Sequence, residues 1–220
     1  MADAIKVAVA GANGRMGSTV CRAVESADGL ELVGRADPEL GTAVAEAIAG
    51  ADVLVDFSVP GSALANAREA AAAGVHVVIG TTGFDTTELE SIEGANVFAA
   101  PNFAIGAVLM MRFAEEAAGH FPSAEIVELH HEGKLDAPSG TAALTARRMS
   151  DALGGEPPIH SVRLPGIVAS QEVIFGGPGE TLTIRHDTVD RECFMPGVVL
   201  AIRHVGSLES SPVIGLENLL

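Results

Sequence analysis

Residues 128–149, ELHHEGKLDAPSGTAALTARRM, hold the densest group of chemically capable side chains in this 220-residue chain. Two adjacent histidines, His130 and His131, are followed by Lys134 and then by a Pro-Ser-Gly-Thr turn at 138–141. Residues of these types can form a metal site, a seat for a phosphate, or acid and base groups around a small acid. Their spacing decides between these three possibilities.

A metal site fits the spacing worst. Zinc needs three or four ligands in a tetrahedral array, whereas neighbouring residues on a strand, such as His130 and His131, point to opposite faces. No cysteine or clear third ligand accompanies them in this segment. The sequence therefore predicts no metal here.

The residues after the histidines suit an anion. Ser139, Gly140 and Thr141 follow a proline and open a helical stretch, and backbone N–H groups at a helix N-terminus bind anions. Lys134 adds a positive charge nearby, and a histidine titrates close to neutral pH, so it can exchange a proton with a substrate. We therefore predict a pocket for a small dicarboxylate or other carboxylate, with one of the two histidines as the proton source.

A second candidate site lies near the N-terminus, in VAVAGANGRMGSTV. Glycines at 11, 14 and 17 follow a strand-like run and open a helical one, an arrangement that lets the backbone approach a pyrophosphate. Asp37 follows Gly17 by 20 residues, the usual place for an acid that binds the ribose hydroxyls of a dinucleotide. A tight turn without a ligand is the alternative, but the surrounding strand, helix and acid favour dinucleotide binding.

Charge bears on the identity of this nucleotide. Asp37 favours NADH because a carboxylate repels the 2′-phosphate of NADPH, whereas Arg15 and Arg35 would offset part of that repulsion. The sequence therefore favours NADH and leaves NADPH open. Two later loops, GTTGF at 80–84 and APNFAIG at 100–106, each follow a predicted strand, and we expect them beside the nicotinamide half.

The elements that position these residues change character along the chain. In the first hundred residues, Val/Ile runs alternate with alanine-rich helical stretches such as 39–49 and 85–92, which indicates a Rossmann-type doubly wound parallel sheet in an α/β fold. Later runs alternate polar and apolar residues, typical of a second α+β domain on a mixed, largely antiparallel sheet. We predict a dinucleotide-binding domain of residues 1–102 plus about 194–220, to which the tail returns, and a substrate-binding and oligomerisation domain of residues 103–193.

Composition excludes several classes of function. Thirteen basic residues against 29 acidic ones give a net charge of −16, and such a surface repels nucleic acid. No apolar run approaches the roughly 18–20 residues that cross a bilayer, and the N-terminus has no leader pattern. We therefore expect no membrane partner and a cytoplasmic location. Cys21 and Cys193 lie outside any motif and are expected to be small core residues.

Several stretches together resemble the dihydrodipicolinate reductase family: GANGRMG, DFSVP, GTTGF, APNFAIGAVL, ELHHEGKLDAPSGTA and EVIFGGPGETLTIRHD. The resemblance implies NAD(P)H-dependent reduction of 4-hydroxy-tetrahydrodipicolinate (dihydrodipicolinate) to tetrahydrodipicolinate, in the diaminopimelate route to lysine. Hydride would pass to C4 of the cyclic dicarboxylate after its 4-hydroxyl is lost as water, and an acid would protonate the resulting enamine. The resemblance also implies a homotetramer joined through the substrate-domain sheets.

The same resemblance implies roles for individual residues. His130 corresponds to the family's proton donor and acceptor, and Lys134 to its second catalytic group. His131, Gly140 and Thr141 correspond to contacts with the substrate carboxylates. The cofactor contacts fall on the glycine loop, the ribose-binding acid and the two later loops, that is, on Gly11, Ala12, Asn13, Gly14, Arg15, Met16, Asp37, Gly80, Thr81, Thr82, Ala100, Pro101, Asn102 and Phe103.

The chain departs from the family pattern in two ways. The family often has HHRHK or HHPHK where this chain has HHEGK, so Glu132 and Gly133 take positive charge away from the substrate, in the direction of a higher KM. The chain is also short at 37–53 and 149–161, where loops are trimmed.

Two other functions would use the same glycine loop. An amino-acid dehydrogenase of the aspartate type would not need the carboxylate seat formed by 134–141. A sensor would bind NADH without turning it over.

Overall fold

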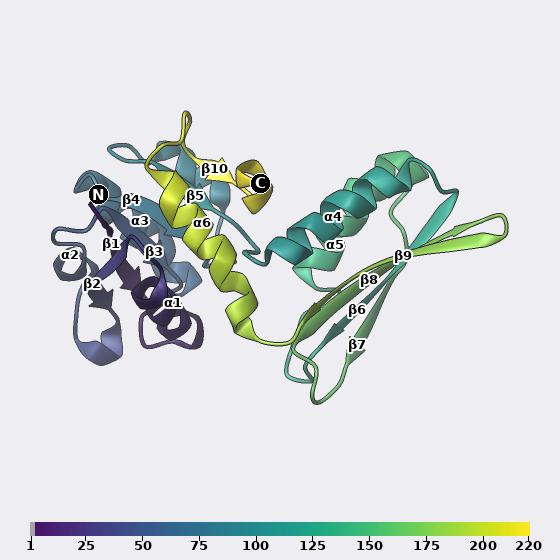
Figure 1. The fold of residues 1–220 in the computed structure, drawn as a ribbon, viewed down its shortest axis with the longest axis horizontal. Helices are drawn as coiled ribbons and strands as arrows, with labels where there is room; N and C mark the ends of the chain where they lie inside the picture. The colour runs from purple at the N-terminus through teal and green to yellow at the C-terminus, as the bar shows by residue number, and fades with distance from the viewer. Residues whose placement is uncertain (1–2) are drawn as a thin grey trace. The chain divides into compact units, whose positions relative to one another are not determined.

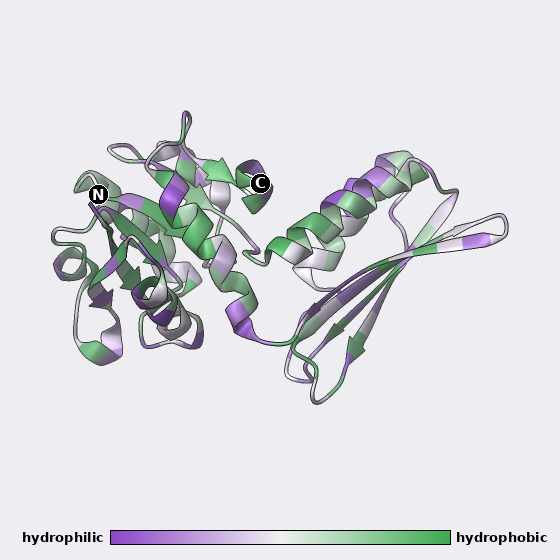
Figure 2. Ribbon diagram, in the orientation of Figure 1, coloured by the Kyte–Doolittle hydropathy of each residue, from purple (hydrophilic) through white to green (hydrophobic). Residues whose placement is uncertain are grey.

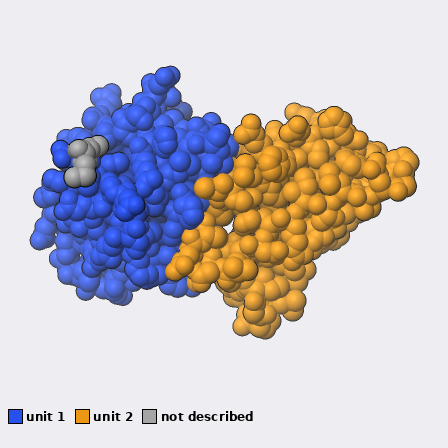
Figure 3. Space-filling view, viewed as in Figure 1, with its two compact units in different colours: residues 1–103, 194–220 blue, residues 104–193 orange. Residues whose placement is uncertain are grey.

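The computed structural model describes residues 3–220, which fall into two compact units (Figure 3). Unit 1 comprises Met1–Phe103 together with Phe194–Leu220, and unit 2 comprises Ala104–Cys193. Each unit has its own sheet and its own core. Within residues 3–220, we find no helix with the length and hydropathy that a bilayer-spanning segment requires.

Unit 1 is built on a sheet in which every neighbouring pair of strands is parallel (Figure 1). Its central strands are buried because helices cover both faces, and this explains their near-continuous apolar runs. β1 (Ile5–Ala10) lies between β2 (Leu30–Ala36) and β3 (Val53–Asp56), so the chain runs from β1 to β2 on one side and then crosses to β3 on the other. The carboxyl ends of β1 and β3 therefore form the switch point at which such sheets bind ligands. The strand order is β10 (Val213–Ile214), β5 (Val97–Ala99), β4 (His76–Ile79), β3 (Val53–Asp56), β1 (Ile5–Ala10) and β2 (Leu30–Ala36).

Helices cover both faces of this sheet: α1 (Arg15–Ser26), α2 (Val44–Ala47), α3 (Pro60–Ala72) and α6 (Met195–Val205). α2 and α3 pack on one face, where Ala63 and Ala67 join the core cluster of Leu54 and Val77. α1 packs against α6, which lies along β3, β4 and β5. The doubly wound fold predicted from the sequence is confirmed.

Two stretches with a helical pattern form less α-helix than the sequence suggests. Residues 39–49 hold only the short α2, after a 3₁₀ turn at Pro38–Leu40 that ends in the left-handed Gly41 (φ 69°). Residues 85–92 form the 3₁₀ helix Thr86–Ser91, in which Asp85 accepts the Thr87 N–H at 3.0 Å. A glycine or aspartate that favours a turn limits the α-helix in each case.

Unit 2 carries a second sheet, in the order β7 (Ile159–Arg163), β6 (Ser123–His130), β8 (Ala169–Gly177) and β9 (Glu180–Thr188). β6 and β7 are parallel and the other pairs antiparallel, so the prediction of a mixed, largely antiparallel sheet is confirmed. α4 (Ile105–Ala118) and α5 (Gly140–Leu153) pack on one face, over a core that includes Ile126, Met149 and Phe175. Figure 2 shows hydrophilic and hydrophobic residues alternating around α4 and α5, as expected of amphipathic helices packed on a sheet.

The C-terminal tail belongs to unit 1. β10 adds to the edge of the sheet beside β5, and Ser211 Oγ accepts the Val97 N–H at 2.9 Å. Leu216 is fully buried next to α6. The tail therefore packs against the sheet and helix of unit 1.

The two cysteines are free thiols. Cys21 is buried in α1, as expected of a core residue. Cys193 is half-buried, and its Sγ lies 3.7 Å from Thr188 Oγ1.

Candidate active site

The geometry of the glycine loop between β1 and α1 requires residues without a Cβ at two positions. Gly11 has a φ of 73°, which favours glycine, and a Cβ there would lie 2.5 Å from the Phe57 carbonyl oxygen. A Cβ on Gly17 would lie 2.0 Å from the Gly11 carbonyl oxygen. The first turn of α1 therefore packs directly on the backbone of the loop, as the glycine spacing predicted.

The start of α1 suits an anion. Gly14 is the N-cap in an extended conformation, and among residues 3–220 no side chain caps the N–H groups that follow it. The first turn of α1 also lacks an acidic residue, so no carboxylate within that turn offsets the partial positive charge of the helix N-terminus. These features fit a pyrophosphate. Around them, Ala12 is buried, Met16 is half-buried, and Asn13 and Arg15 are exposed.

Asp37 directly follows β2 and contacts this loop. Its carboxylate accepts the Asn13 N–H at 3.1 Å and the Glu39 N–H at 2.9 Å, one on each oxygen. Asp37 is 9% exposed, so these bonds fix its orientation while each oxygen keeps a further acceptor position. Glu39 accepts a hydrogen bond from the Asn13 side chain at 2.5 Å. Two carboxylates therefore stand beside the loop, where the sequence analysis named only one.

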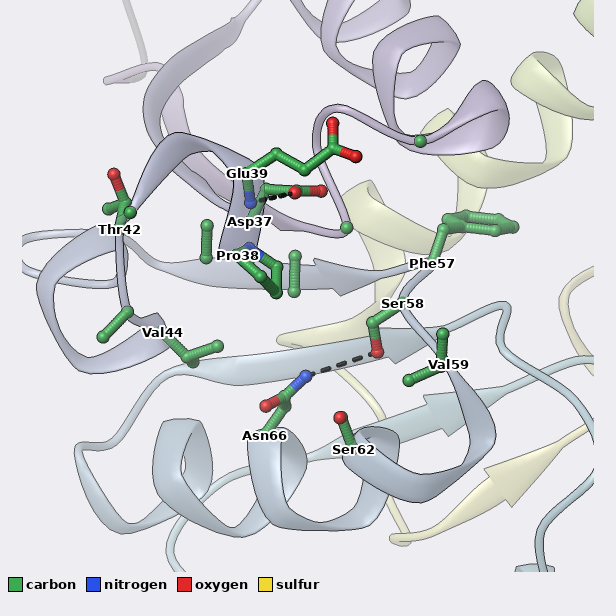
Figure 4. A pocket seen from close by; sticks show the side chains of 16 residues that line it. Asp37, Pro38, Glu39, Thr42, Val44, Phe57, Ser58, Val59, Ser62 and Asn66 are labelled. Atoms are coloured by element: carbon green, nitrogen blue, oxygen red, sulfur yellow. Dashed lines mark hydrogen bonds between the residues drawn. The ribbon is translucent and has the colours of Figure 1, made fainter.

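A cavity of about 640 Å³ opens between the glycine loop and the segment after β3. Figure 4 shows Asp37 and Glu39 along its upper part and Ser58 and Asn66 along its lower part. Phe57 closes one end of it. A cavity of this size, with apolar walls and a few polar groups, suits the adenosine half of a dinucleotide.

Sequence reasoning assigned no site residue to the DFSVP stretch, which supplies Phe57 and Ser58 to this cavity. The available signal was its place directly after β3, because β3 pairs with β1 and their carboxyl ends lie side by side. Glu39 and Asn66 had no comparable signal. They reach the cavity from a 3₁₀ turn and from α3.

Asp56, at the end of β3, is a fully buried carboxylate that ties three segments together. It accepts hydrogen bonds from Ser58 Oγ at 2.8 Å, from Asn66 Nδ2 at 2.8 Å and from Thr81 Oγ1 at 2.6 Å. Thr81 was predicted as a cofactor contact, and its hydroxyl is engaged with Asp56. Its N–H donates to the Asp56 carbonyl at 3.3 Å, whereas Thr82 and Gly83, beside it in the loop, are exposed.

The two later loops meet around a second cavity of about 260 Å³ in unit 1. Both predicted segments contribute to it, and the C-terminal strand β10 adds a residue that the sequence analysis did not name. The residues that line this cavity include Thr81, Thr82, Gly83, Ala99, Ala100, Pro101 and Ile214. The structure thus brings the two loops together.

Phe103 and Gly80 take up packing roles. Phe103 is 2% exposed, and its ring packs on Phe57 and Phe98 with centroid separations of 5.8 and 6.1 Å. A Cβ on Gly80 would lie 2.2 Å from the Phe57 ring, so glycine is required for this packing. A cofactor contact at Phe103 would have to use its backbone. Asn102, beside it, is half-buried.

The predicted acid and base residues lie in unit 2, at the end of β6. His130 is the last residue of that strand, with 17% of its side chain exposed, and its Nδ1 lies 2.5 Å from Oε2 of Glu128. Burial lowers the pKa of His130 below its usual value, and the Glu128 carboxylate opposes this shift. The positive charges of Lys134 and Arg163 lower the pKa further. The free protein therefore favours a neutral imidazole at neutral pH.

Lys134 sits in a tight turn, in which its N–H donates to the His131 carbonyl at 3.1 Å. Its Nζ lies 2.8 Å from Oδ1 of Asp136, and this hydrogen-bonded ion pair lowers the pKa of the Asp136 carboxyl. His131, Glu132 and Gly133 are all exposed. The turn thus presents one lysine and one histidine on the surface next to His130.

The N-terminus of α5 is capped by Ser139. This residue is 3% exposed, its Oγ accepts the Ala142 N–H at 3.2 Å, and its own N–H donates to Glu128 at 3.3 Å. Ser139, which the sequence analysis placed in the anion seat, thus uses both its hydroxyl and its N–H within the protein. Gly140 is exposed, and among residues 3–220 nothing beyond its chain neighbours and the backbone of its own helix lies within 4 Å of the place a Cβ would take, so its backbone is accessible to an anion. Thr141 is half-buried.

Fold and sites together define a class of protein. A doubly wound unit with a glycine loop, in one chain with a unit that carries a histidine, a lysine and an accessible helix N-terminus, is typical of a Rossmann-type oxidoreductase. The family model described as "Dihydrodipicolinate reductase, N-terminus" matches residues 5–103, and the one described as "Dihydrodipicolinate reductase, C-terminus" matches residues 106–220. The chain belongs to the dihydrodipicolinate reductase family.

Individual relatives agree with this assignment. The 4-hydroxy-tetrahydrodipicolinate reductase of Desulfitobacterium hafniense is 45% identical over an alignment of 264 positions, which covers 98% of each chain. That of Beutenbergia cavernae is 47% identical and covers 91% of this chain and 93% of its own. The solved dipicolinate-bound dihydrodipicolinate reductase of Paenisporosarcina sp. TG-14 is 36% identical, with a TM-score of 0.86 over 99% of this chain and 100% of its own.

Proposed function

We propose that this chain catalyses the NAD(P)H-dependent reduction of 4-hydroxy-tetrahydrodipicolinate to tetrahydrodipicolinate, a step of the diaminopimelate route to lysine. The observation that carries the proposal is its 45% identity to a reductase of that name across 98% of both chains. The clustering of His130, Lys134 and the start of α5 at one end of the unit 2 sheet supports it. A bound nicotinamide would supply the hydride.

We propose unit 1 as the cofactor-binding domain and NADH as the favoured cofactor, with NADPH as a second one. Asp37 and Glu39 both line the cavity next to the glycine loop, and the 2′-phosphate of NADPH would bring negative charge beside these two carboxylates. Arg35 is paired with Glu25 on the surface at 2.6 Å, so its charge is already partly compensated. Arg15 is the remaining cation of the loop.

We propose unit 2 as the substrate-binding domain. Its anion-binding groups would be Lys134, His131 and the backbone N–H groups of Gly140 and Thr141, while Ser139 keeps the helix start in place. His130 would donate a proton from Nε2 to the enamine that forms when hydride is added to the substrate. Dipicolinate, the ligand named for the solved Paenisporosarcina enzyme, carries two carboxylates as the substrate does, and we expect this chain to bind it.

The assay that tests this function generates the substrate in place from pyruvate and aspartate semialdehyde and follows oxidation of NADH and NADPH separately. Lys134→Ala is expected to reduce kcat by about 10²-fold or more, because it removes a catalytic cation. Lys6→Ala is the matched control, since Lys6 is an exposed lysine of β1. A folded wild-type protein that binds NADH without turnover would contradict the proposed reaction.

We also propose a cytoplasmic homotetramer, assembled through the face of the unit 2 sheet opposite α4 and α5. Light scattering is expected to give four times the chain mass of 22.4 kDa. A particle with the mass of one chain would contradict the tetramer and leave the proposed reaction untouched.

A further inference from the structure

Glu128 is a charged residue in an apolar row of β6. Because side chains on a strand alternate between faces, Ala124, Ile126, Glu128 and His130 lie on the same face as the core of unit 2. Ala124 and Ile126 pack in that core, and Glu128 is 0% exposed. A carboxylate is almost never buried this deeply unless it is paired.

The partners of Glu128 account for its burial. Arg163 on β7 donates to both carboxylate oxygens, at 2.9 and 2.7 Å, and Ser139 donates its backbone N–H at 3.3 Å. Burial alone would raise the pKa of the Glu128 carboxyl. Hydrogen bonds from Arg163, Ser161 and His130 outweigh it and hold the pKa below its usual value. Glu128 is therefore a carboxylate in the folded protein.

The ionised state of Glu128 determines how His130 carries its proton. A carboxylate only accepts hydrogen bonds, so the ring nitrogen 2.5 Å from it, Nδ1, must be the one that bears hydrogen. In the neutral ring, Nε2 is then the unprotonated nitrogen and the one through which protons come and go. The charged ring gains a stabilising partner for its Nδ1–H.

We propose that Glu128 is a positioning residue for the acid at His130: it holds the imidazole in the Nδ1–H tautomer, directs Nε2 to the substrate and stabilises the imidazolium. Arg163 keeps Glu128 ionised and is itself held by the carbonyls of Val162 and Asp136, both at 2.7 Å. The inference rests on the proposed function, because it assigns a role to Glu128 only if His130 transfers a proton. It adds a residue, Arg163, that lies 35 positions from Glu128 in the chain.

A purely structural role for Glu128 predicts different behaviour. In that case the Glu128–Arg163 pair would only join β6 to β7 and the start of α5, and its loss would lower kcat by the same factor at every pH. A positioning role predicts a pH-dependent loss, because removing the carboxylate lowers the pKa of His130 and so shrinks its protonated fraction most at high pH. The other charged groups that act on His130 are Lys134, Arg163 and Asp136, and all three stay in place in this comparison.

The test compares Glu128→Gln with the wild type in the full chain. We expect kcat at neutral pH to fall by roughly ten- to hundredfold, with KM for NADH unchanged. The decline of kcat on the alkaline side of its pH profile should move to lower pH. Nitrogen-15 NMR above the pKa of His130 is expected to show the Nδ1–H tautomer in the wild type and an increased Nε2–H population in Glu128→Gln. Glu128→Asp, which keeps the charge, should recover part of the loss.

Glu88→Gln is the matched control. Glu88 also pairs with a basic side chain, that of Arg68, at 3.3 Å, but it lies in unit 1 and both side chains are about half exposed (50% and 49%). We expect wild-type activity from this variant.

Three results would overturn the inference. The first is an Nε2–H tautomer of His130 in the wild-type protein, a measurement that needs no variant to fold. The second is an active wild type whose Glu128→Gln variant loses activity equally at every pH, or not at all, which removes the inference and leaves the proposed function standing. The third is a wild type that binds NADH without turnover, which removes both.

Discussion

Replacing Gly17 with alanine tests whether the glycine loop is the dinucleotide site. Gly17 is buried in the first turn of α1, and a Cβ there would lie 2.0 Å from the Gly11 carbonyl oxygen and 2.6 Å from its carbon. Ordinary van der Waals contact begins near 3.4 Å. The contact is with backbone, so no side-chain rotation relieves it, and α1 must move from the loop by about 1.4 Å.

This displacement sets the expected magnitude. The N–H groups at the start of α1 would move by about the same distance from a bound pyrophosphate, and a hydrogen bond to a charged group contributes about 1.5–3 kcal/mol. Losing one such bond weakens NADH binding by about ten- to hundredfold, since about 1.4 kcal/mol is a factor of ten. Overpacking also costs about 1–3 kcal/mol of folding free energy, so we expect a lower melting temperature.

Calorimetric titration of NADH, at a temperature where both proteins are folded by circular dichroism, measures the effect. Gly61→Ala is the matched control. Gly61 lies in the first turn of α3, and among residues 3–220 nothing beyond its chain neighbours and the backbone of its own helix lies within 4 Å of the place its Cβ would take. We expect this variant to bind NADH as the wild type does. A folded Gly17→Ala protein with unchanged NADH affinity would refute the assignment of the loop.

Three further predictions follow from charge. Asp37→Asn removes a carboxylate from the nucleotide cavity, so the ratio of kcat/KM for NADH over NADPH should fall by about tenfold; an unchanged ratio in steady-state assays would count against Asp37 as the discriminating group. The pKa of His130 in the free protein should lie below 6.5 by NMR titration and rise when dipicolinate binds, because a dianion stabilises the imidazolium; a free-protein pKa at or above 6.5 would contradict the burial argument. The pKa of Glu128 is depressed in the folded protein, so the ionised Glu128 contributes its full stability to the fold above the unfolded pKa of about 4.5, and this contribution is lost as pH falls through the lower folded pKa. The free energy of unfolding of Glu128→Gln, measured with urea, should therefore depend less on pH below 5 than that of the wild type. Equal pH dependence in the variant and the wild type would argue against the ion pair.

Much of unit 1 could be predicted because its signals are local. Three glycines between an apolar strand and a helix, with an aspartate 20 residues later, specify a turn that only glycine can form and a carboxylate at the end of the next strand. The continuous apolar runs indicated a sheet covered on both faces, and the structure has that sheet. Local patterns failed where a turn residue competed with a helix, as at Gly41 and Asp85.

The histidine–lysine segment was also identified from the sequence, because residues 130–141 are close along the chain. Their hydrogen-bond partners were not. Ser139 was expected to face a ligand, but its hydroxyl caps α5, and the Thr81 hydroxyl is taken up by Asp56. A side chain with several possible partners chooses between them only when the surrounding elements are in place.

The sequence by itself determined the class of fold, the glycine loop, and the presence of acid, base and cationic groups at 130–141. Only the tertiary structure decided that Glu128 is buried between His130 and Arg163, and that Glu39 and Asn66 reach the nucleotide cavity. The first set depends on periodicity and on backbone rules that act over a few residues. The second depends on strand register, which pairs β6 with β7 and brings together residues 35 positions apart, and no local pattern records that register.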